Sequence, residues 1–154
     1  MMEVKELAVQ DIYRLTELFD YNDVDAMISE WTCDIQNNVI DIFVLMNSST
    51  LVGELHAMYQ ADDENYAVRG KRAYLFAFRI HKDYQGKGYG KYLLQRVLDI
   101  LKDRGYYEFT VGVEDDNLKA QHIYQSFGFN EMLLRKQEEY QGDSYEYNLY
   151  LSKK

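Results

Sequence analysis

The 154-residue sequence contains no proline and only one cysteine, Cys33. Without proline, the turns must be made by glycine, asparagine, aspartate and serine. A single cysteine cannot form an internal disulfide, which is typical of a reducing, cytoplasmic setting. Cys33 stands beside Trp31 in a stretch that we expect to be helical, and we interpret it as a packing residue rather than a nucleophile.

Long apolar runs are also missing. No apolar run reaches 18 residues, so we expect no membrane span and no membrane partner. The opening segment MMEVKELAVQD lacks the apolar core of a signal peptide, which again favours a cytoplasmic protein. The length suits a single domain over residues 1–154, with a core large enough for independent stability.

Positive charge is scarce: 17 Lys and Arg stand against 26 Asp and Glu, a net charge of −9. This excess of acid argues against nucleic acid and against anionic membrane surfaces as partners, and it is compatible with a cationic ligand. The acidic residues gather in segments 20–30, 62–64 and 114–116. Each segment taken alone is most simply a solvated surface.

Hydrophobic periodicity predicts strands that alternate with helices. We expect strands at 3–7, 40–46, 51–59, 71–80, 106–113, 129–136 and 144–151, and helices at 10–19, 23–37, 88–104 and 117–128. Asn117 can cap the last of these helices, and Gly142-Asp143 would lie in the turn of the hairpin that the last two strands form. The strand at 71–80 is apolar on both faces and is therefore central. This order of elements predicts an α/β fold, a three-layer α/β/α sandwich with a mixed sheet.

Three glycines, Gly86, Gly88 and Gly90, follow the strand at 71–80 and open the helix at 88–104. Glycine permits positive φ angles and a close approach of a ligand to the main chain. The following helix start offers free N–H groups and a positive dipole end, and Lys87 and Lys91 add charge. We interpret this turn as a diphosphate site made mostly by backbone amides, with a ligand-free turn as the alternative.

Two common phosphate-binding templates do not fit this turn. A P-loop requires Ser or Thr where the chain has Tyr92, and the Gly-x-Gly-x-x-Gly fingerprint fails from Gly86 and from Gly88. The spacing Gln85-x-x-Gly88-x-Gly90 closely resembles the coenzyme A signature of the GNAT acetyltransferase superfamily. A second motif also resembles that family and follows in the same order: Asn117, Ala120, Tyr124, Gly128 and Phe129.

The resemblance implies a GNAT-like sandwich with a centrally splayed sheet. Acetyl-CoA, the acetyl donor, would lie in the wedge between the two splayed strands, at 71–80 and 106–113. An amide near Phe78 would stabilise charge on the thioester oxygen. Tyr124 would be the general acid that protonates the leaving thiolate. No metal site is predicted. The implied cofactor contacts are Phe78, Arg79, Ile80, Gln85, Gly86, Lys87, Gly88, Tyr89, Gly90, Lys91, Asn117 and Ala120.

The general base is less evident. Some members of the family carry a catalytic Glu at positions that correspond here to about Arg72 and to Gly112, so both carboxylates are missing. Glu54 is our candidate on the strand at 51–59, and a water chain to solvent is the default. Further candidates are Glu114, Asp115, His56 and His81.

We therefore predict an acetyl-CoA-dependent N-acetyltransferase that moves an acetyl group to an amine by direct attack on the thioester. The acidic segments at 20–30 and 62–64 border the acceptor side in the resembling fold, so we expect a small cationic amine as acceptor. One alternative is a coenzyme A-binding module without turnover, and another is a phosphate-binding regulatory domain. The resemblance also allows a homodimer.

Overall fold

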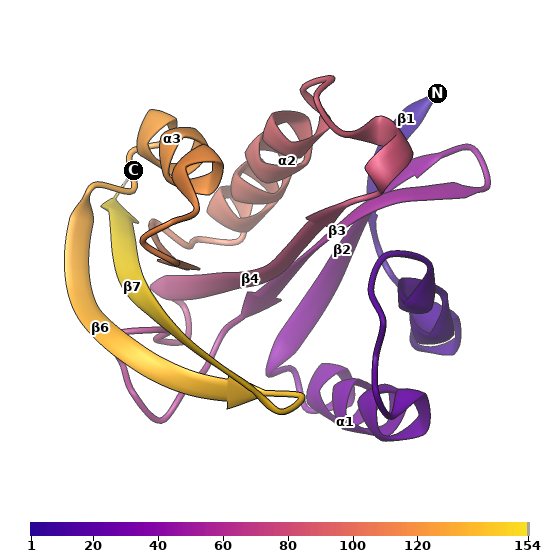
Figure 1. Cartoon of the computed structure of the whole chain (residues 1–154), viewed down its shortest axis with the longest axis horizontal. Coiled ribbons are helices and arrows are strands. Elements are labelled where there is room, and N and C mark those ends of the chain that lie inside the picture. The colour runs from indigo at the N-terminus through magenta and orange to yellow at the C-terminus, as the bar shows by residue number, and fades with distance from the viewer. Residues whose placement is uncertain (154) are drawn as a thin grey trace.

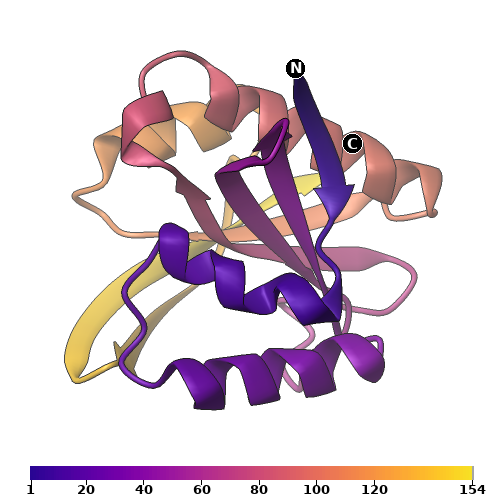
Figure 2. The same ribbon diagram turned by 90° about the vertical axis from the view of Figure 1, so that its right-hand side faces the viewer.

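The computed structural model describes residues 1–153 and places seven strands in one mixed sheet with helices on both faces (Figures 1 and 2). The strand order is β1-β2-β3-β4-β5-β7-β6. β4 and β5 pair in parallel, and the other neighbours pair antiparallel. The bounds are β1 Met2–Glu6, β2 Ile40–Asn47, β3 Thr50–Met58, β4 Arg72–Ile80, β5 Glu108–Val113, β6 Glu131–Tyr140 and β7 Asp143–Lys153.

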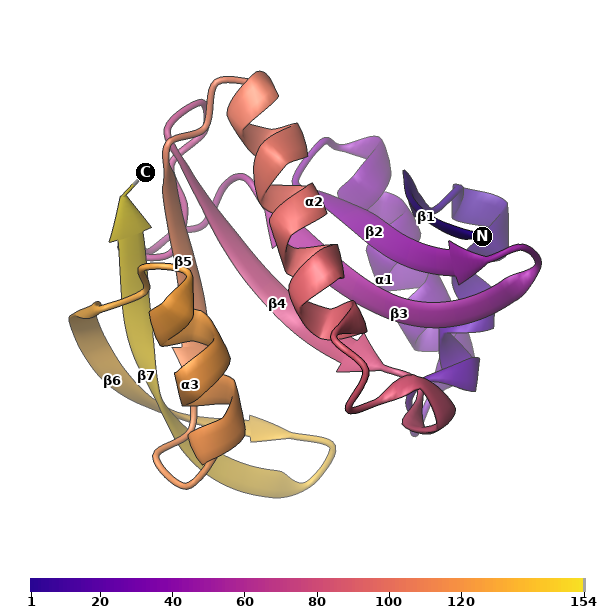
Figure 3. The same ribbon diagram turned by 90° about the horizontal axis from the view of Figure 1, so that it is seen from above.

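The helices form the two outer layers. The 3₁₀-helix η1 (Val9–Glu17) and α1 (Val24–Gln36) cover one face of the sheet, and α2 (Tyr89–Asp103) and α3 (Leu118–Ser126) cover the other (Figures 2 and 3). A short 3₁₀-helix, η2 (Lys82–Tyr84), precedes α2. The predicted three-layer α/β/α fold is confirmed. Within residues 1–153, no helix is long and apolar enough to cross a membrane.

Apolar side chains fill both spaces between the layers. On one side of the sheet, α2 buries Leu93, Leu94, Val97, Leu98 and Leu101. On the other side, η1 buries Ile12 and Leu15 and α1 buries Met27. The core therefore holds a central sheet between two helical layers, as the alternating pattern predicts.

Two details of the sequence interpretation are wrong. Cys33 is exposed, whereas Trp31 of α1 packs inward, with its ring centroid 4.6 Å from that of His56. The turn of the last hairpin is Gln141-Gly142, whereas the sequence suggested Gly142-Asp143. Gln141 and Gly142 both have positive φ angles, +53° and +88°, as a two-residue type I′ turn requires, so Asp143 already belongs to β7.

The sheet opens between β4 and β5 (Figure 3). Their pairing ends at Leu75–Val111, although β4 continues to Ile80 and β5 continues to Val113. β4 also bulges at Ala77, whose φ is +52°. Between the pairs Glu54–Arg79 and His56–Phe76, β3 advances by two residues and β4 by three, so β4 carries one extra residue. The predicted central splay is therefore confirmed.

Candidate active site

A cavity of about 1540 Å³ fills the wedge between β4 and β5. This exceeds the ~300–1,000 Å³ of an ordinary small-molecule pocket, so it has room for a long ligand and a second molecule. One part is lined by residues 84–86 and 88–91 and by α3, and we name it the α2 side. The other part is lined by α1 and by the β6–β7 hairpin, and we name it the hairpin side.

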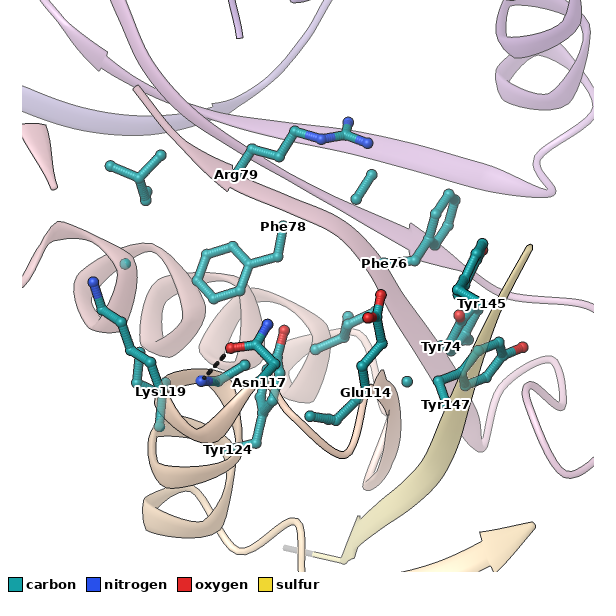
Figure 4. Close-up of a pocket in the computed structure, with 18 of the residues that line it drawn as sticks. Tyr74, Phe76, Phe78, Arg79, Glu114, Asn117, Lys119, Tyr124, Tyr145 and Tyr147 are labelled. Atoms are coloured by element: carbon teal, nitrogen blue, oxygen red, sulfur yellow. Dashed lines mark hydrogen bonds between the residues drawn. The ribbon is translucent and has the colours of Figure 1, made fainter. Parts of the chain in front are cut away.

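The β4 bulge distributes side chains between these two sides. Before the bulge, Tyr74 and Phe76 lie on the hairpin side, where they stack with ring centroids 5.4 Å apart. After the bulge, Phe78 and Ile80 pack with the core under α2. Arg79 points away from Phe78, across the strand (Figure 4). A bulge residue breaks the regular alternation of a strand, which explains why Phe76 and Phe78 face different sides.

The turn before α2 has the backbone geometry of an anion cradle. Gly86 and Gly88 have φ angles of +75° and +86°, and an added Cβ at either would meet nothing within 4 Å. The Gln85 side chain fixes the start of the turn, because its Nε2 donates to the Ile80 carbonyl oxygen at 2.9 Å. The turn therefore leaves an open approach to its main chain.

The amides at the start of α2 complete this cradle. The first helical hydrogen bond runs from Tyr92 N to the Gly88 oxygen, at 3.1 Å. The preceding N–H groups of Tyr89, Gly90 and Lys91 therefore have no acceptor within the helix. All three residues line the cavity. Free amides at a helix N-terminus, with positive φ glycines before them, fit a diphosphate.

Helix α3 brings the second motif to the α2 side. Asn117 caps this helix, since its Oδ1 accepts from Ala120 N at 3.1 Å (dashed line in Figure 4). Tyr124 lies two turns further along, 8% exposed, with its ring centroid 6.2 Å from that of Phe78. Burial raises the pKa of the Tyr124 phenol above its ordinary value. The phenol is therefore protonated at neutral pH, as an unperturbed phenol also is, so it can act there as a proton donor and not as a base.

The hairpin side is acidic and aromatic. Alternate residues of the hairpin face the cavity: Lys136, Glu138 and Tyr140 from β6, and Tyr145 and Tyr147 from β7. Aromatic walls and carboxylates together favour a cation, because rings and acidic groups both attract positive charge. The carboxylates that line the whole cavity are Glu30, Asp62, Asp63, Glu114 and Glu138.

The tip of the hairpin is tied to the opposite side of the cavity. Gln141 Oε1 accepts from Asn22 N at 2.9 Å, and Gln141 Nε2 donates to the Asp20 carbonyl oxygen at 3.2 Å. The hairpin accordingly curves toward α1 (Figure 1). A single side chain thus links the β6–β7 turn to the loop between η1 and α1.

Glu54 is fully buried beneath the hairpin side. Its Oε1 accepts from Arg79 Nη1 at 3.1 Å, and its Oε2 lies 2.6 Å from His56 Nε2. Neither Glu54 nor His56 is among the residues that line the cavity. Arg79 also donates to the Tyr21 hydroxyl at 3.1 Å, and its guanidinium carbon lies 3.9 Å from the centre of the Phe19 ring.

The model of the acetyltransferase (GNAT) family matches residues 7–129 of this sequence. The chain belongs to the GNAT family. The family prediction from the coenzyme A signature and the Asn117–Tyr124 motif is therefore confirmed.

Among curated relatives of this GNAT chain, the L-amino acid N-acyltransferase MnaT of Escherichia coli is 42% identical over 50 residues, which are 32% of this chain and 29% of that protein. The ribosomal protein bS18-alanine N-acetyltransferase of E. coli is 38% identical over 64 residues, which are 42% and 43% of the two chains. The matches therefore span less than half of these relatives.

Solved structures share the fold over the whole chain. The acetyltransferase yncA from Salmonella typhimurium, solved with its cofactor acetyl-CoA, has a TM-score of 0.72 and 16% identity, over 99% of this chain and 93% of that one. At such low identity, the likeness concerns the fold.

In this GNAT chain, the cavity brings most of the predicted site residues together. The lining includes Phe78, Arg79, Ile80, Gln85, Gly86, Gly88, Tyr89, Gly90, Lys91, Asn117, Ala120 and Tyr124. Lys87 lies outside it, in a small depression with Met2 and Tyr92. The roles of all these residues, and that of Glu54 as a base, stay predictions.

The two positions of this GNAT chain at which a base carboxylate was sought hold other contacts. The Arg72 Nε donates to Glu108 Oε1 at 2.9 Å, an ion pair at the start of β4 and β5. The ring of Tyr147 covers Gly112. The sequence interpretation did not find Glu138, Tyr145 and Tyr147; their alternate spacing in the last hairpin was the available signal.

Proposed function

We propose that this chain is an acetyl-CoA-dependent N-acetyltransferase that acts by direct attack of an amine on the thioester. The observation that supports it is the cavity through the opened sheet. An anion cradle lies at one end, an acidic and aromatic wall lies at the other, and Tyr124 lies in the lining. This arrangement suits a phosphorylated donor and a cationic acceptor that meet inside the sheet.

The residues of the α2 side fit the donor. The free amides of Tyr89, Gly90 and Lys91 would hold the diphosphate, and β4 beyond Leu75 has a backbone edge unpaired with β5 that an amide-containing arm could follow. When bound, acetyl-CoA supplies a thioester whose acetyl carbon is open to attack by a neutral amine. The Phe78 amide would donate to the oxygen on which negative charge develops.

Tyr124 would provide the proton that the leaving sulfur needs. A thiolate has an ordinary pKa of about 8.5, so protonation as it leaves favours product. The Tyr124 phenol carries its proton at physiological pH, as a phenol with an ordinary pKa of about 10 does, and burial reinforces that state. Water in the open cavity would accept the proton that the attacking amine loses and would return a proton to Tyr124.

We further propose that the acceptor is a cationic amine. Five carboxylates and four Lys or Arg residues line the cavity, and two of these four, Lys91 and Lys119, lie on the α2 side. The cationic residues on the hairpin side are Arg79 and Lys136. Arg79 is already paired with Glu54, so it offers little charge to an anionic acceptor. The relative MnaT is an L-amino acid acyltransferase by name, and an amino acid would bring a carboxylate into this acidic region.

An assay of acetyl-CoA consumption over an amine panel tests this function. The panel should contain diamines, monoamines, amino acids and peptides that begin with alanine. Consumption with the cationic amines, and its loss in Tyr124→Phe, would support the proposal. A preference for amino acids or for peptides would reject the acceptor class.

Binding without turnover is the second candidate. It is favoured by the absence of a carboxylate at Arg72 and Gly112. Calorimetry with coenzyme A separates the two candidates, because tight binding without consumption over the whole panel would indicate a binding module. No binding would reject both.

A further inference from the structure

Gly112 and Tyr147 occupy adjoining space on the hairpin side of β5. A Cβ added at Gly112 would lie 2.9 Å from Cδ2 and 3.1 Å from Cε2 of the Tyr147 ring. β5 pairs with β7 at Gly112–Leu149, and Tyr147 is the next residue of β7 on that face. A side chain at position 112 and the Tyr147 ring thus exclude each other, so the glycine allows Tyr147 its place.

The hydroxyl of Tyr147 helps to hold one carboxylate, Glu138. Tyr147 donates to Glu138 Oε1 at 3.0 Å, and Tyr145 donates to Glu138 Oε2 at 3.3 Å. The Tyr66 hydroxyl lies 2.7 Å from that of Tyr147 and is its donor in this arrangement. Both oxygens of Glu138 therefore receive an O–H, and their orientation is fixed before any ligand arrives.

These phenols are suited to be permanent donors. Burial, the hydrogen bond with Tyr66 and the contact with Glu138 raise the pKa of Tyr147 above its ordinary value. Burial and the charge of Glu138 do the same for the pKa of Tyr145. Both phenols therefore remain protonated at neutral pH and can donate to Glu138.

Aromatic rings face this carboxylate within the cavity. Tyr145 and Tyr147 form one wall with ring centroids 6.0 Å apart, and Tyr74 and Phe76 of β4 form another (Figure 4). An ammonium group is attracted both by such rings and by a carboxylate, and a methylene chain packs against the rings. The arrangement is that of a subsite for an alkylammonium group.

The chain's own Lys136 shows how such a group sits here. Its Nζ lies 3.4 Å from Glu138 Oε1 and 5.5 Å from the centre of the Tyr66 ring. The Lys136 and Glu138 side chains are 49% and 37% exposed, and an ion pair of that exposure contributes little to stability. A ligand ammonium can therefore displace Lys136 at small cost.

We propose that Glu138 is a specificity-determining carboxylate and that it holds the distal ammonium of a diamine acceptor. This rests on the proposed function, in which the other amino group of the diamine is acetylated. A carboxylate stabilises an ammonium against loss of its proton. Glu138 is therefore suited to the nitrogen that keeps its charge, and the reacting nitrogen lies nearer to Tyr124.

Calorimetry with protein saturated in coenzyme A tests this proposal without any turnover. The probes are 1,4-diaminobutane and n-butylamine, which differ by one amino group. We expect the wild-type protein to bind the diamine at least about tenfold more tightly, as a hydrogen bond to a charged group allows. Glu138→Gln should remove this difference, because the second ammonium of the diamine then has no carboxylate to bind.

Glu139→Gln is the matched control, since it removes the same charge from the next residue of β6, which is not among the lining residues. This variant should keep the difference in affinity between 1,4-diaminobutane and n-butylamine. Tyr147→Phe keeps the ring over Gly112 but loses the donor to Glu138, and it should weaken diamine binding several-fold. Lys136→Met removes the internal competitor and should tighten diamine binding.

Equal affinity of the wild-type protein for both amines would overturn the proposal. So would equal losses in Glu138→Gln and Glu139→Gln, which would indicate a general charge effect, or weaker diamine binding by Lys136→Met. Binding that depends on Glu138 without any acetyl-CoA consumption would keep this inference and reject the proposed function. Acetylation of amines with no dependence on Glu138 would keep the proposed function and reject this inference.

Discussion

Gly88→Val is expected to remove tight binding of coenzyme A. Gly88 has a φ of +86°, where an L-residue costs about 1–2 kcal/mol. An added Cβ would meet nothing within 4 Å, so the valine side chain would stand in the open space over the turn. That space is the proposed approach of the diphosphate to the main chain, and we expect at least a tenfold loss of affinity, about 1.4 kcal/mol.

Gly105→Val is a matched control at the other end of α2. Gly105 has a φ of +98°, and an added Cβ there also meets nothing within 4 Å. Both variants therefore carry a similar backbone strain, and both should lower the free energy of unfolding by about 1–2 kcal/mol. Only Gly88→Val places its side chain at the cradle.

Calorimetry with coenzyme A measures the affinity, and urea denaturation measures the free energy of unfolding. The expected result is similar destabilisation of the two variants and a loss of coenzyme A affinity in Gly88→Val alone. A folded Gly88→Val protein with wild-type affinity would refute the site assignment. An equal loss of affinity in Gly105→Val would refute the claim that the effect is local.

Tyr124→Phe should lower kcat by about 10²–10⁴-fold with little change in coenzyme A affinity, because it removes the proposed proton donor; a fall of less than about threefold with chemistry rate-limiting would make Tyr124 a packing residue. For a cationic acceptor, kcat/KM should fall several-fold from low to high salt while kcat hardly changes, since salt screens the lining carboxylates; steady-state kinetics that show no salt dependence would contradict this. Burial raises the pKa values of Tyr74 and Tyr124. The unfolded chain ionises its tyrosines near pH 10 while these two stay neutral in the fold, so their contribution to the free energy of unfolding should be constant below that pH and fall above it; urea denaturation at pH 9 and pH 11 checks the direction, and an increase would contradict it.

The sequence predicts those features that local rules determine. Gly86 and Gly88 mark the cradle because positive φ angles favour glycine, and the structure has both. Asn117 is predicted as the cap of α3, and its side chain makes that hydrogen bond. Turns and helix caps depend on a few residues that are neighbours in the sequence, so they can be predicted without knowing which distant segments pack against them.

Features that depend on distant pairing were not predictable in the same way. Glu138 and Tyr147 enter the cavity because β7 and β6 continue the sheet beyond β5 and then curve toward α1. Their alternate spacing indicates a shared face of the hairpin, but no local pattern indicates that this face meets the cavity. On α1, Trp31 and Cys33 are two positions apart and cannot face the same side of a helix. The large Trp31 side chain packs inward against His56 and Cys33 lies on the exposed side, so the packing interpretation of Cys33 was wrong.

The bulge at Ala77 connects both halves of the site and has no signal in the sequence, because alanine rarely adopts a φ of +52°. Regular alternation would place Phe78 beside Phe76 on the hairpin side. The bulge instead brings Phe78 under the cradle, where its Cζ lies 3.5 Å from a Cβ built at Gly90. It also turns Arg79 toward Glu54, so the guanidinium forms an ion pair with a carboxylate inside the protein. Lys136 is then the cationic residue of the hairpin side that faces its carboxylates. The same irregularity that shapes the proposed donor half therefore also favours a cation in the proposed acceptor half.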